Sequence, residues 1–283
     1  MVIVPAMNDK MWENPAVQQT INTIRTWDNI SVLEPDEGFL ACGTTGKGRM
    51  PEIEVIQEAI EYALSPKTLT GKRVLITAGA TQERIDPVRF LSNYSTGKMG
   101  IALAQECARR GADVEFVSGP VHVLPHHPNI HTTNVESAQQ MFDAATRLYP
   151  GCQAAILCAA VADFTPDHRA EEKIKREGDE LVLRLRPTQD IAQRLGEMKQ
   201  PCQRLVGFAL ETCDEAEHAH DKLERKHLDF IVLNSLRNPG AGFQHDTNKV
   251  TIIGPRGETE YELKSKGEVA QDIVDELVKA LGQ

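Results

Sequence analysis

The chain has 283 residues, 41% of them hydrophobic, which is enough to bury one large core or two smaller ones. Its formal net charge of −10 at pH 7 argues against a surface for polyanions, so we expect no nucleic-acid partner. No run approaches the roughly 18 apolar residues of a membrane span, and the six cysteines form no CxxC pair, as is typical of a reducing compartment. These features predict a cytoplasmic protein with free thiols and no membrane contact.

Short elements make up the N-terminal segment. In chain order they are a strand of buried type at 2–4, a helix from about Asn14, a strand at 31–33, a glycine-rich loop at 38–52 and a helix at 53–64. Residues 65–72 are polar and contain Pro and Gly, which makes them the best linker candidate. We therefore predict a domain boundary that separates residues 1–66 from residues 67–283.

Alternating strands and helices are predicted for the rest of the chain. The predicted strands cover 74–77, 114–118, 154–159, 205–210 and 230–234, and the predicted helices cover 97–110, 136–149, 190–198, 214–227 and 268–281. Strands that are apolar throughout and alternate with helices are typical of a parallel sheet covered on both faces. The sequence therefore predicts an α/β fold with a doubly wound, mainly parallel, Rossmann-like sheet.

Two segments interrupt this alternation. Residues 173–185 alternate polar and apolar side chains around a turn at Gly178, and residues 249–263 do so around 254–257. Both are predicted as β-hairpins inserted in the α/β domain, where hairpins can project as flaps or dimer arms.

A candidate nucleotide site lies at residues 73–100. An apolar strand is followed by Gly79 and a long polar turn, and a helix then begins after Ser-Thr-Gly at 95–97. Small residues let backbone N–H groups approach a phosphate at such a helix N-terminus. Lys98 is followed by Met99 rather than Ser or Thr, which excludes a Walker P-loop, and a single early glycine does not make the dinucleotide fingerprint.

Polar side chains follow several predicted strands, namely Asn93, Asp163, Glu211 and Asn234. The carboxyl ends of parallel strands meet at one edge of a sheet, where ligands bind, so these residues predict a single site. The amide of Asn93 can donate to a developing oxyanion, a role that depends on position rather than on pKa. The alternative for Asn93 is an Asx-turn or a helix cap.

Two lysine pairs are candidates for phosphate contacts. Lys173 and Lys175 lie on one side of a predicted strand and can reach a phosphate, or they can be solvated edge-strand lysines. Lys222 and Lys226 share a helix face, which suits two phosphate contacts or pairing with acidic neighbours such as Glu224. No His, Cys and Asp set has zinc spacing, whereas magnesium held mainly by phosphates needs only one or two carboxylates. Metal ligands therefore stay unassigned.

Three blocks carry a resemblance to a known family: SNYSTGKMG at 92–100, AAVADF at 159–164 with KIK at 173–175, and VGFALET at 206–212. They resemble the bacterial bifunctional phosphopantothenoylcysteine decarboxylase/phosphopantothenate-cysteine ligase of coenzyme A biosynthesis. The resemblance covers essentially the whole chain.

The resemblance implies that residues 67–283 form a CTP-dependent ligase. Such a ligase activates 4'-phosphopantothenate as an acyl-cytidylate with release of pyrophosphate, and cysteine then displaces CMP. Asn93 would stabilise acyl transfer, Lys173 would reach the phosphates, and CTP would bring Mg²⁺. The other positions implied for CTP are Leu157, Cys158, Ala159, Asp163, Gln189, Asp190, Ile191, Ala192, Phe208, Lys222 and Lys226. Ser95, Gly97 and Lys98 are expected to bind substrate, and a homodimer is expected in which the Lys173 hairpin completes the site.

Residues 1–66 resemble the C-terminal tail of the flavin-dependent decarboxylase half. Within PAMNDKMW at 5–12, Asn8 would contact substrate, and Cys42 in a flap would be the proton donor. The resemblance places most of the flavin site and a catalytic histidine before Met1. We therefore expect this segment to be a remnant, or a split product of a longer protein, that meets FMN only if a decarboxylase partner supplies it, and we do not expect the chain alone to decarboxylate.

Two alternatives to a ligase stay open. One is an NAD-type oxidoreductase on a similar sheet, against which the missing glycine fingerprint counts. The other is a non-catalytic fragment that binds a separately encoded decarboxylase half.

Overall fold

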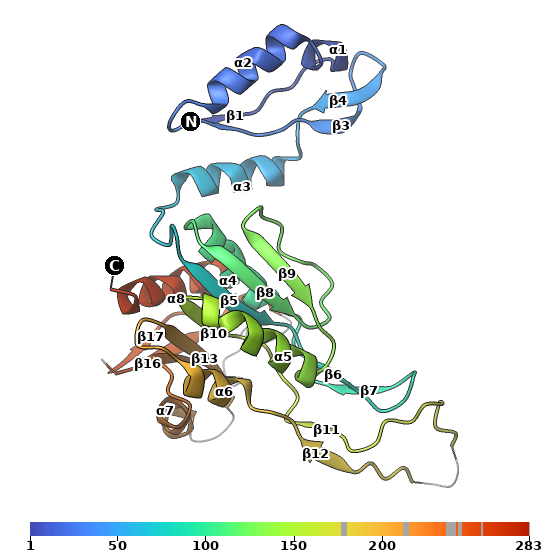
Figure 1. The fold of residues 1–283 in the computed structure, drawn as a ribbon, viewed down its shortest axis with the longest axis vertical. Coiled ribbons are helices and arrows are strands. Elements are labelled where there is room, and N and C mark those ends of the chain that lie inside the picture. The colour runs from blue at the N-terminus through green and yellow to red at the C-terminus, as the bar shows by residue number, and fades with distance from the viewer. Residues whose placement is uncertain (177–179, 212–214, 236–241, 243–244, 256, 283) are drawn as a thin grey trace. The chain divides into compact units, whose positions relative to one another are not determined.

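The computed structural model of the protein describes residues 1–176, 180–211, 215–235, 242, 245–255 and 257–282. The chain separates into two compact units, Met1–Pro66 and Lys67–Gln283 (Figure 1). The second unit contains the large sheet and all of the residues implied for CTP.

The N-terminal unit is small and built from short elements. They are β1 (Val2–Ile3), α1 (Asp9–Trp12), α2 (Pro15–Arg25), β2 (Ser31–Val32), β3 (Asp36–Phe39), β4 (Thr45–Arg49) and α3 (Ile53–Leu64). β1 pairs in parallel with β2. α2 begins where it was predicted because the Asn14 side chain accepts the Ala16 N–H and Pro15 occupies the first helical position.

The prediction of a glycine-rich loop at 38–52 is wrong, because β3 and β4 form an antiparallel hairpin there. The glycines allow the backbone of β4 to approach the backbone of residues 7–9 closely. A Cβ on Gly48 would lie 2.2 Å from the Met7 carbonyl oxygen, and one on Gly46 would lie 2.8 Å from the Asp9 Cβ. Only glycine lets β4 pack this closely against residues 7–9.

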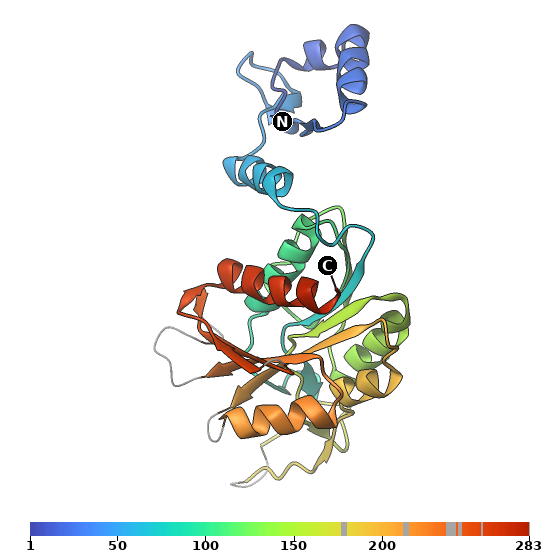
Figure 2. The same ribbon diagram turned by 90° about the vertical axis from the view of Figure 1, so that its left-hand side faces the viewer.

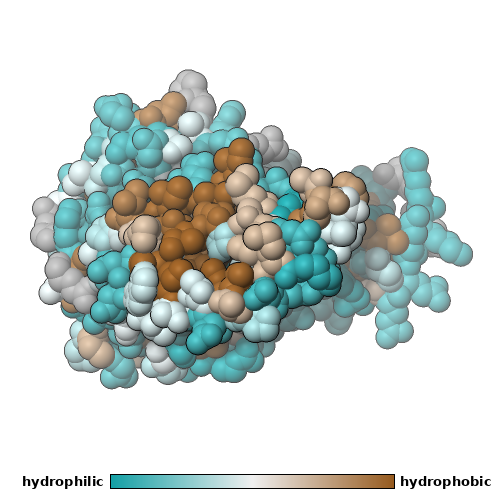
Figure 3. All heavy atoms as spheres, turned by 90° about the horizontal axis from the view of Figure 1, so that it is seen from above, coloured by the Kyte–Doolittle hydropathy of each residue, from teal (hydrophilic) through white to brown (hydrophobic). Residues whose placement is uncertain are grey.

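Apolar side chains gather in a broad patch on the molecular surface (Figure 3). In the N-terminal unit, α3 buries none of its residues, although its apolar residues recur at helical spacing. Its exposed apolar side chains are Ile53, Val55, Ile60 and Leu64. Surfaces of this kind are typical of protein interaction sites.

The second unit contains an eight-stranded sheet with helices on both faces. The strands are β5 (Arg73–Ala78), β8 (Asp113–Ser118), β9 (Ile130–Asn134), β10 (Ala154–Leu157), β13 (Arg204–Glu211), β14 (Phe230–Ser235), β16 (Val250–Gly254) and β17 (Gly257–Glu260). The helices are α4 (Lys98–Arg109), α5 (Ala138–Leu148), η1 (Tyr149–Gly151), α6 (Ile191–Met198), α7 (Glu215–Arg225) and α8 (Lys266–Ala280).

The strand order is β17-β16-β14-β13-β10-β5-β8-β9. The six strands from β14 to β9 are parallel, β16 pairs antiparallel with β14, and β17 pairs antiparallel with β16. The chain runs from β5 outward through β8 to β9 and then returns to β10 on the other side of β5. The order therefore reverses between β5 and β10, which is where open α/β sheets bind ligands.

Two apolar cores cover the two faces of this sheet. Alternate residues of β5 point to opposite faces, so Ile76 joins the core with α4 and α8 whereas Leu75 joins the core with α5, α6 and α7. Figure 2 shows α4 and α8 on one side of the sheet and α7 on the other. The predicted doubly wound, mainly parallel α/β fold is confirmed.

The two predicted hairpins differ from the observed structure. No strand covers 173–176; instead β11 (Phe164–Pro166) pairs with β12 (Leu185–Pro187), and Gly178 lies outside the described residues. The second hairpin exists as β16 and β17 but extends the central sheet rather than projecting from it. Two smaller pairs are β6 (Gln82–Arg84) with β7 (Phe90–Ser92), and β15 (Thr247–Asn248) with β18 (Lys264–Ser265).

The described cysteines are all free thiols, as predicted, while Cys213 lies outside the described residues. Across the described ranges, the structure contains no helix long and apolar enough to cross a membrane.

Candidate functional site

A cavity of about 540 Å³ opens at the carboxyl ends of β10, β13 and β14, beside the N-terminus of α4. It is lined by every residue that the family resemblance implies for the ligase except Lys173, whereas the candidate Lys175 does not line it. The side chain of the candidate Glu211 lies outside the described part of the structure. The implied residues that line the cavity are Asn93, Ser95, Gly97, Lys98, Leu157, Cys158, Ala159, Asp163, Gln189, Asp190, Ile191, Ala192, Phe208, Lys222 and Lys226. The fold thus gathers, in one cavity, side chains that lie up to 133 positions apart between Asn93 and Lys226.

Asn93 is tied to the backbone where the strand order reverses. Its Nδ2 group donates to the carbonyl oxygens of Ala160 at 3.1 Å and Val161 at 3.2 Å. An amide NH₂ has two donors, so both are engaged. Asn93 does not cap α4, because the N-cap is Gly97 without a side-chain hydrogen bond. To donate to an oxyanion, Asn93 must therefore exchange one carbonyl for the ligand.

The N-terminus of α4 depends on two glycines. Gly97 has a φ of +77°, and a Cβ there would lie 2.5 Å from Val121 Cγ1. A Cβ on Gly100 would lie 2.4 Å from the Ala78 Cβ, so only glycine lets the first turn of α4 pack directly on β5. The consequence is a helix N-terminus whose backbone N–H groups lie at the cavity wall.

The β10 end of the cavity is mostly backbone and small side chains. Leu157 is buried and Cys158 is half-buried. Burial raises the pKa of the Cys158 thiol to about 12, which keeps it protonated and unreactive near neutral pH. The Ala159 N–H points to Thr77 Oγ1 at 3.4 Å. This segment is suited to shaping a ligand pocket rather than to nucleophilic chemistry.

An ion pair joins α6 to the segment that follows α7. Lys226 Nζ lies 2.9 Å from Asp190 Oδ2, and Asp190 also caps α6 by accepting the Gln193 N–H at 3.0 Å. Burial alone would raise the pKa of Asp190, but the Gln193 N–H and the Lys226 ammonium outweigh it, and the pKa lies below its ordinary value. Asp190 therefore stays ionised and holds Lys226 at the cavity.

Lys173 is exposed and does not line the cavity, but the backbone next to it is anchored. Arg89 donates to the Ile174 carbonyl at 2.7 Å, and Asp86 accepts the Ile174 N–H at 3.2 Å. Asp86 is 1% exposed. Hydrogen bonds from Arg89 hold the pKa of Asp86 well below its usual range. The segment that carries Lys173 is thus fastened at its base by a charged pair.

Several cavity residues were not found from the sequence, above all Lys266, which opens α8 and is 7% exposed. Asp246 does not line the cavity, but it lies 2.6 Å from the cavity residue Lys98. In sequence, Lys266 belongs to an ordinary polar helix start, where Ser265 and Glu268 form a capping box. Nothing local in the sequence signals that Lys266 donates to the carbonyls of Gly242 and His245, which lie more than twenty positions earlier in the chain.

The N-terminal unit brings together its own two predicted residues, Asn8 and Cys42. Asn8 Nδ2 donates to Cys42 Sγ at 2.9 Å. Thr44 Oγ1 lies 3.2 Å from the same sulfur and 3.1 Å from Asp9 Oδ1, and its single proton can be donated to either atom. Hydrogen bonds from the Thr44 side chain and then from the Thr44 backbone N–H, with a smaller one from Asn8, lower the pKa of the exposed Cys42 thiol. The arrangement favours a thiol that exchanges its proton readily.

Among the described residues, no group of three or more His, Cys, Asp and Glu side chains is placed to hold a metal ion. Asp163 is an exposed carboxylate on the cavity lining. One such carboxylate suffices for magnesium that is held mainly by phosphates.

Comparison with known sequences covers both units. Residues 69–281 match the family described as DNA/pantothenate metabolism flavoprotein C-terminal domain, and residues 1–65 match the flavoprotein family. The coenzyme A biosynthesis bifunctional protein CoaBC of Haemophilus influenzae is 43% identical over 278 residues, which cover 98% of this chain and 69% of that protein. A protein of an unidentified prokaryote, named cysteine/cysteine sulfinic acid decarboxylase, is 50% identical over 282 residues, covering 98% of this chain and 78% of that protein.

Comparison with solved structures agrees. The crystal structure of the C-terminal domain of a CoaBC protein is 40% identical, with a TM-score of 0.65, and covers 76% of this chain and 98% of that chain. A DNA/pantothenate metabolism flavoprotein from Streptococcus pneumoniae shares the fold at 22% identity and a TM-score of 0.64, covering 73% of this chain and 98% of that chain. The chain therefore belongs to the CoaBC family of coenzyme A biosynthesis bifunctional proteins.

Proposed function

We propose that the second unit is a phosphopantothenate-cysteine ligase that uses CTP. The observation that carries this proposal is the single cavity that gathers the predicted substrate and nucleotide positions from five separate chain segments. Membership in the CoaBC family supports the same pathway.

The proposed reaction has two steps. The carboxylate of 4'-phosphopantothenate attacks the α-phosphorus of CTP, which forms the acyl-cytidylate and breaks the bond to pyrophosphate. The amino group of cysteine then attacks the acyl carbon, loses a proton, and expels CMP as the amide bond forms. Lys222 and Lys226 would neutralise the triphosphate, and Asn93 would donate to the acyl oxygen once it releases a backbone carbonyl.

Magnesium would be held by the CTP phosphates and Asp163, and it would supply charge neutralisation at the departing pyrophosphate. Lys173 would reach the phosphates from its anchored segment. We further propose a homodimer of the second unit in which this segment completes the site.

We also propose a second candidate function, in which the N-terminal unit contributes Asn8 and Cys42 to a flavin-dependent decarboxylase site. The contact between Asn8 and Cys42 favours it, and a relative named as a decarboxylase is 50% identical. In this proposal FMN belongs to a decarboxylase partner, and the exposed apolar side chains of α3 suit the contact with that partner.

Pyrophosphate release from the purified protein tests the ligase. The reaction contains Mg²⁺, 4'-phosphopantothenate and each nucleoside triphosphate in turn, with and without cysteine. We expect release from CTP that turns over only with cysteine, and a loss of about 10²-fold in kcat for Asn93→Ala if the amide stabilises the transition state. Asn134→Ala, which lies outside the cavity, is the control and should keep full activity.

The same samples distinguish the two candidates. Release of carbon dioxide from phosphopantothenoylcysteine, or from cysteine, is measured in parallel after addition of FMN and of the flavin-binding decarboxylase partner. Carbon dioxide without pyrophosphate would favour the decarboxylase and contradict the ligase. No pyrophosphate with any triphosphate would also contradict the ligase.

A further inference from the structure

The cavity wall that follows β10 is a strip of mostly small residues, 157–163. Residues 157–161 and Asp163 line the cavity, and Ala162 between them is 8% exposed. The first part of this wall continues the ladder of the sheet, because the Ala160 N–H donates to the Gly79 carbonyl at 2.8 Å. Alanine side chains make few packing contacts, so hydrogen bonds to the backbone must fix where the rest of the wall lies.

Two threonines hold both backbone groups of Ala162. Thr81 Oγ1 accepts the Ala162 N–H at 3.0 Å, and Thr188 Oγ1 donates to the Ala162 carbonyl at 2.7 Å. The Thr188 N–H also donates to the carbonyl of Asp163 at 2.9 Å. The two threonines therefore form a clamp on the wall at the residue that precedes Asp163.

The clamp is connected to segments that carry other cavity residues. Ser92 Oγ donates to the Thr81 carbonyl at 2.7 Å, and the residue after Ser92 is Asn93. Thr188 is followed by residues 189–192, which line the cavity at the start of α6. One chain of hydrogen bonds thus joins three of the segments that line the cavity.

Thr81 itself is 0% exposed, so its hydroxyl reaches no ligand in the cavity. Any effect of Thr81 on a ligand must pass through Ala162. If the Ala162 N–H lost this acceptor, it would stay buried without a partner, which costs more than the hydrogen bond contributes when it is made. The wall would then populate other positions, and ligand affinity falls in proportion to the population of the position that binds.

We propose that Thr81 is a positioning residue for the nucleotide, which together with Thr188 fixes the wall in the position that binds CTP. The inference rests on the proposed ligase function, in which the wall belongs to the nucleotide site. It adds a determinant of nucleotide affinity that does not touch the nucleotide.

Calorimetric titration of the full chain with CTP and Mg²⁺, in the absence of 4'-phosphopantothenate, tests the clamp. Thr81→Val removes the hydroxyl, and we expect CTP to bind about tenfold more weakly. Thr81→Ser keeps the hydroxyl and should bind CTP within about threefold of wild type. Thr188→Val removes the other hydroxyl from a half-buried position and should also weaken CTP binding.

The pyrophosphate assay separates affinity from chemistry. In Thr81→Val the KM for CTP should rise while kcat stays within about twofold of wild type, because saturating CTP holds the wall in place. A loss confined to KM is the signature of a residue that positions the binding site without taking part in the reaction.

Hydrogen exchange of the free protein, followed by mass spectrometry, tests the clamp without any ligand. Peptides that cover residues 157–163 should exchange faster in Thr81→Val than in wild type or Thr81→Ser. Peptides that cover β8, at 113–118, should exchange at the wild-type rate, which would exclude a general loss of stability.

Two control variants separate the clamp from the loss of any buried hydrogen bond. Thr146 Oγ1 on α5 is buried and has no hydrogen-bond partner among the residues that the structure describes, so Thr146→Val should leave CTP affinity unchanged. Gln203 lies before β13, and its Nε2 donates to the carbonyls of Tyr149 at 3.0 Å and Cys152 at 2.7 Å. Gln203→Met should lower the free energy of unfolding but leave CTP affinity unchanged.

Two results would overturn the clamp. They are wild-type CTP affinity in Thr81→Val, or an equal loss of affinity in Gln203→Met together with faster exchange throughout the second unit. The ligase proposal fails separately: if wild type binds CTP more tightly than Thr81→Val but releases no pyrophosphate, the ligase alone is contradicted. Pyrophosphate release by wild type with unchanged CTP affinity in Thr81→Val would contradict the clamp alone.

Discussion

At the scale of single residues, Cys42 shows how hydrogen bonds set the chemistry of an exposed thiol. Asn8 and Cys42 are separated by 34 positions and were both predicted from motifs. Thr44 and Asp9, which complete the hydrogen-bond chain, carry no signal of their own in the sequence. The family motif identified the Cys42 thiol. Its neighbours Thr44 and Asp9 become apparent only from the packing of β4 against residues 7–9.

Thr44→Val keeps the shape of the side chain but removes the hydroxyl. The pKa of Cys42 should then rise toward its ordinary value, because the largest cause of its depression is lost. The thiolate fraction at neutral pH should fall, and alkylation by iodoacetamide should slow. Mass spectrometry of the Cys42 peptide measures the rate, with the exposed Cys202 as internal control. Unchanged or faster alkylation of Cys42 would show that Thr44 does not stabilise the thiolate.

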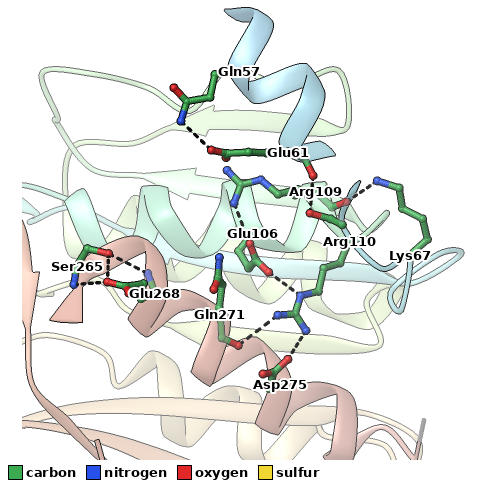
Figure 4. A network of polar contacts seen from close by, with 11 residues as sticks. Gln57, Glu61, Lys67, Glu106, Arg109, Arg110, Ser265, Glu268, Gln271 and Asp275 are labelled. Atoms are coloured by element: carbon green, nitrogen blue, oxygen red, sulfur yellow. Dashed lines mark hydrogen bonds and ion pairs between the residues drawn. The ribbon is translucent and has the colours of Figure 1, made fainter. Parts of the chain in front are cut away.

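At the scale of elements, α4 and α8 are joined by a buried charged network (Figure 4). Arg110 follows α4 and is 6% exposed; it donates to Glu106 Oε1 at 2.6 Å and to the Asp275 carboxylate on α8. Arg109 adds a second contact to Glu106 at 3.0 Å. The cavity residues Lys98 and Lys266 are the first residues of these same two helices.

Arg110→Met should destabilise the protein by about 3 kcal/mol, because Glu106 loses a partner while buried. The double variant with Glu106→Leu should recover most of this loss, since it also removes the buried carboxylate, which Arg109 alone then contacts. Urea unfolding measures both. Arg194→Met, in an exposed pair with Glu197, is the control and should cost less than about 0.5 kcal/mol. A double variant no more stable than the single one would mean that the buried Glu106 charge, left with one arginine instead of two, is not the cause.

Elements were predicted correctly where their own residue pattern determines them. They were predicted wrongly or missed where the pairing strand determines the structure. Fully apolar strands such as β10 were found, while β9, a half-exposed edge strand with His131 and Thr132, was missed. Alternation at 173–185 predicted a hairpin, but alternation does not say which strand will pair, and β12 pairs with β11 instead. The site was found because carboxyl ends of parallel strands meet at one edge; Lys266 was missed because its burial comes from distant residues.

At the scale of the whole molecule, the two large cores contain residues of the second unit alone. Their members run from Leu69 to Leu281, and none comes from residues 1–66. The N-terminal unit has its own small set of buried side chains, including Trp12 and Ile21. A unit that buries its own core should fold on its own.

Residues 67–283 expressed alone should therefore unfold in one cooperative transition, with pyrophosphate release within about twofold of the full chain. Thermal unfolding followed by circular dichroism and the pyrophosphate assay measure this. A shorter piece that ends at Ser265 is the control: it loses α8, whose Val269, Ile273 and Leu277 are fully buried. At about 2–5 kcal/mol for each large buried side chain removed, that piece should not fold. An unfolded 67–283 piece would show instead that the core of the second unit depends on residues 1–66.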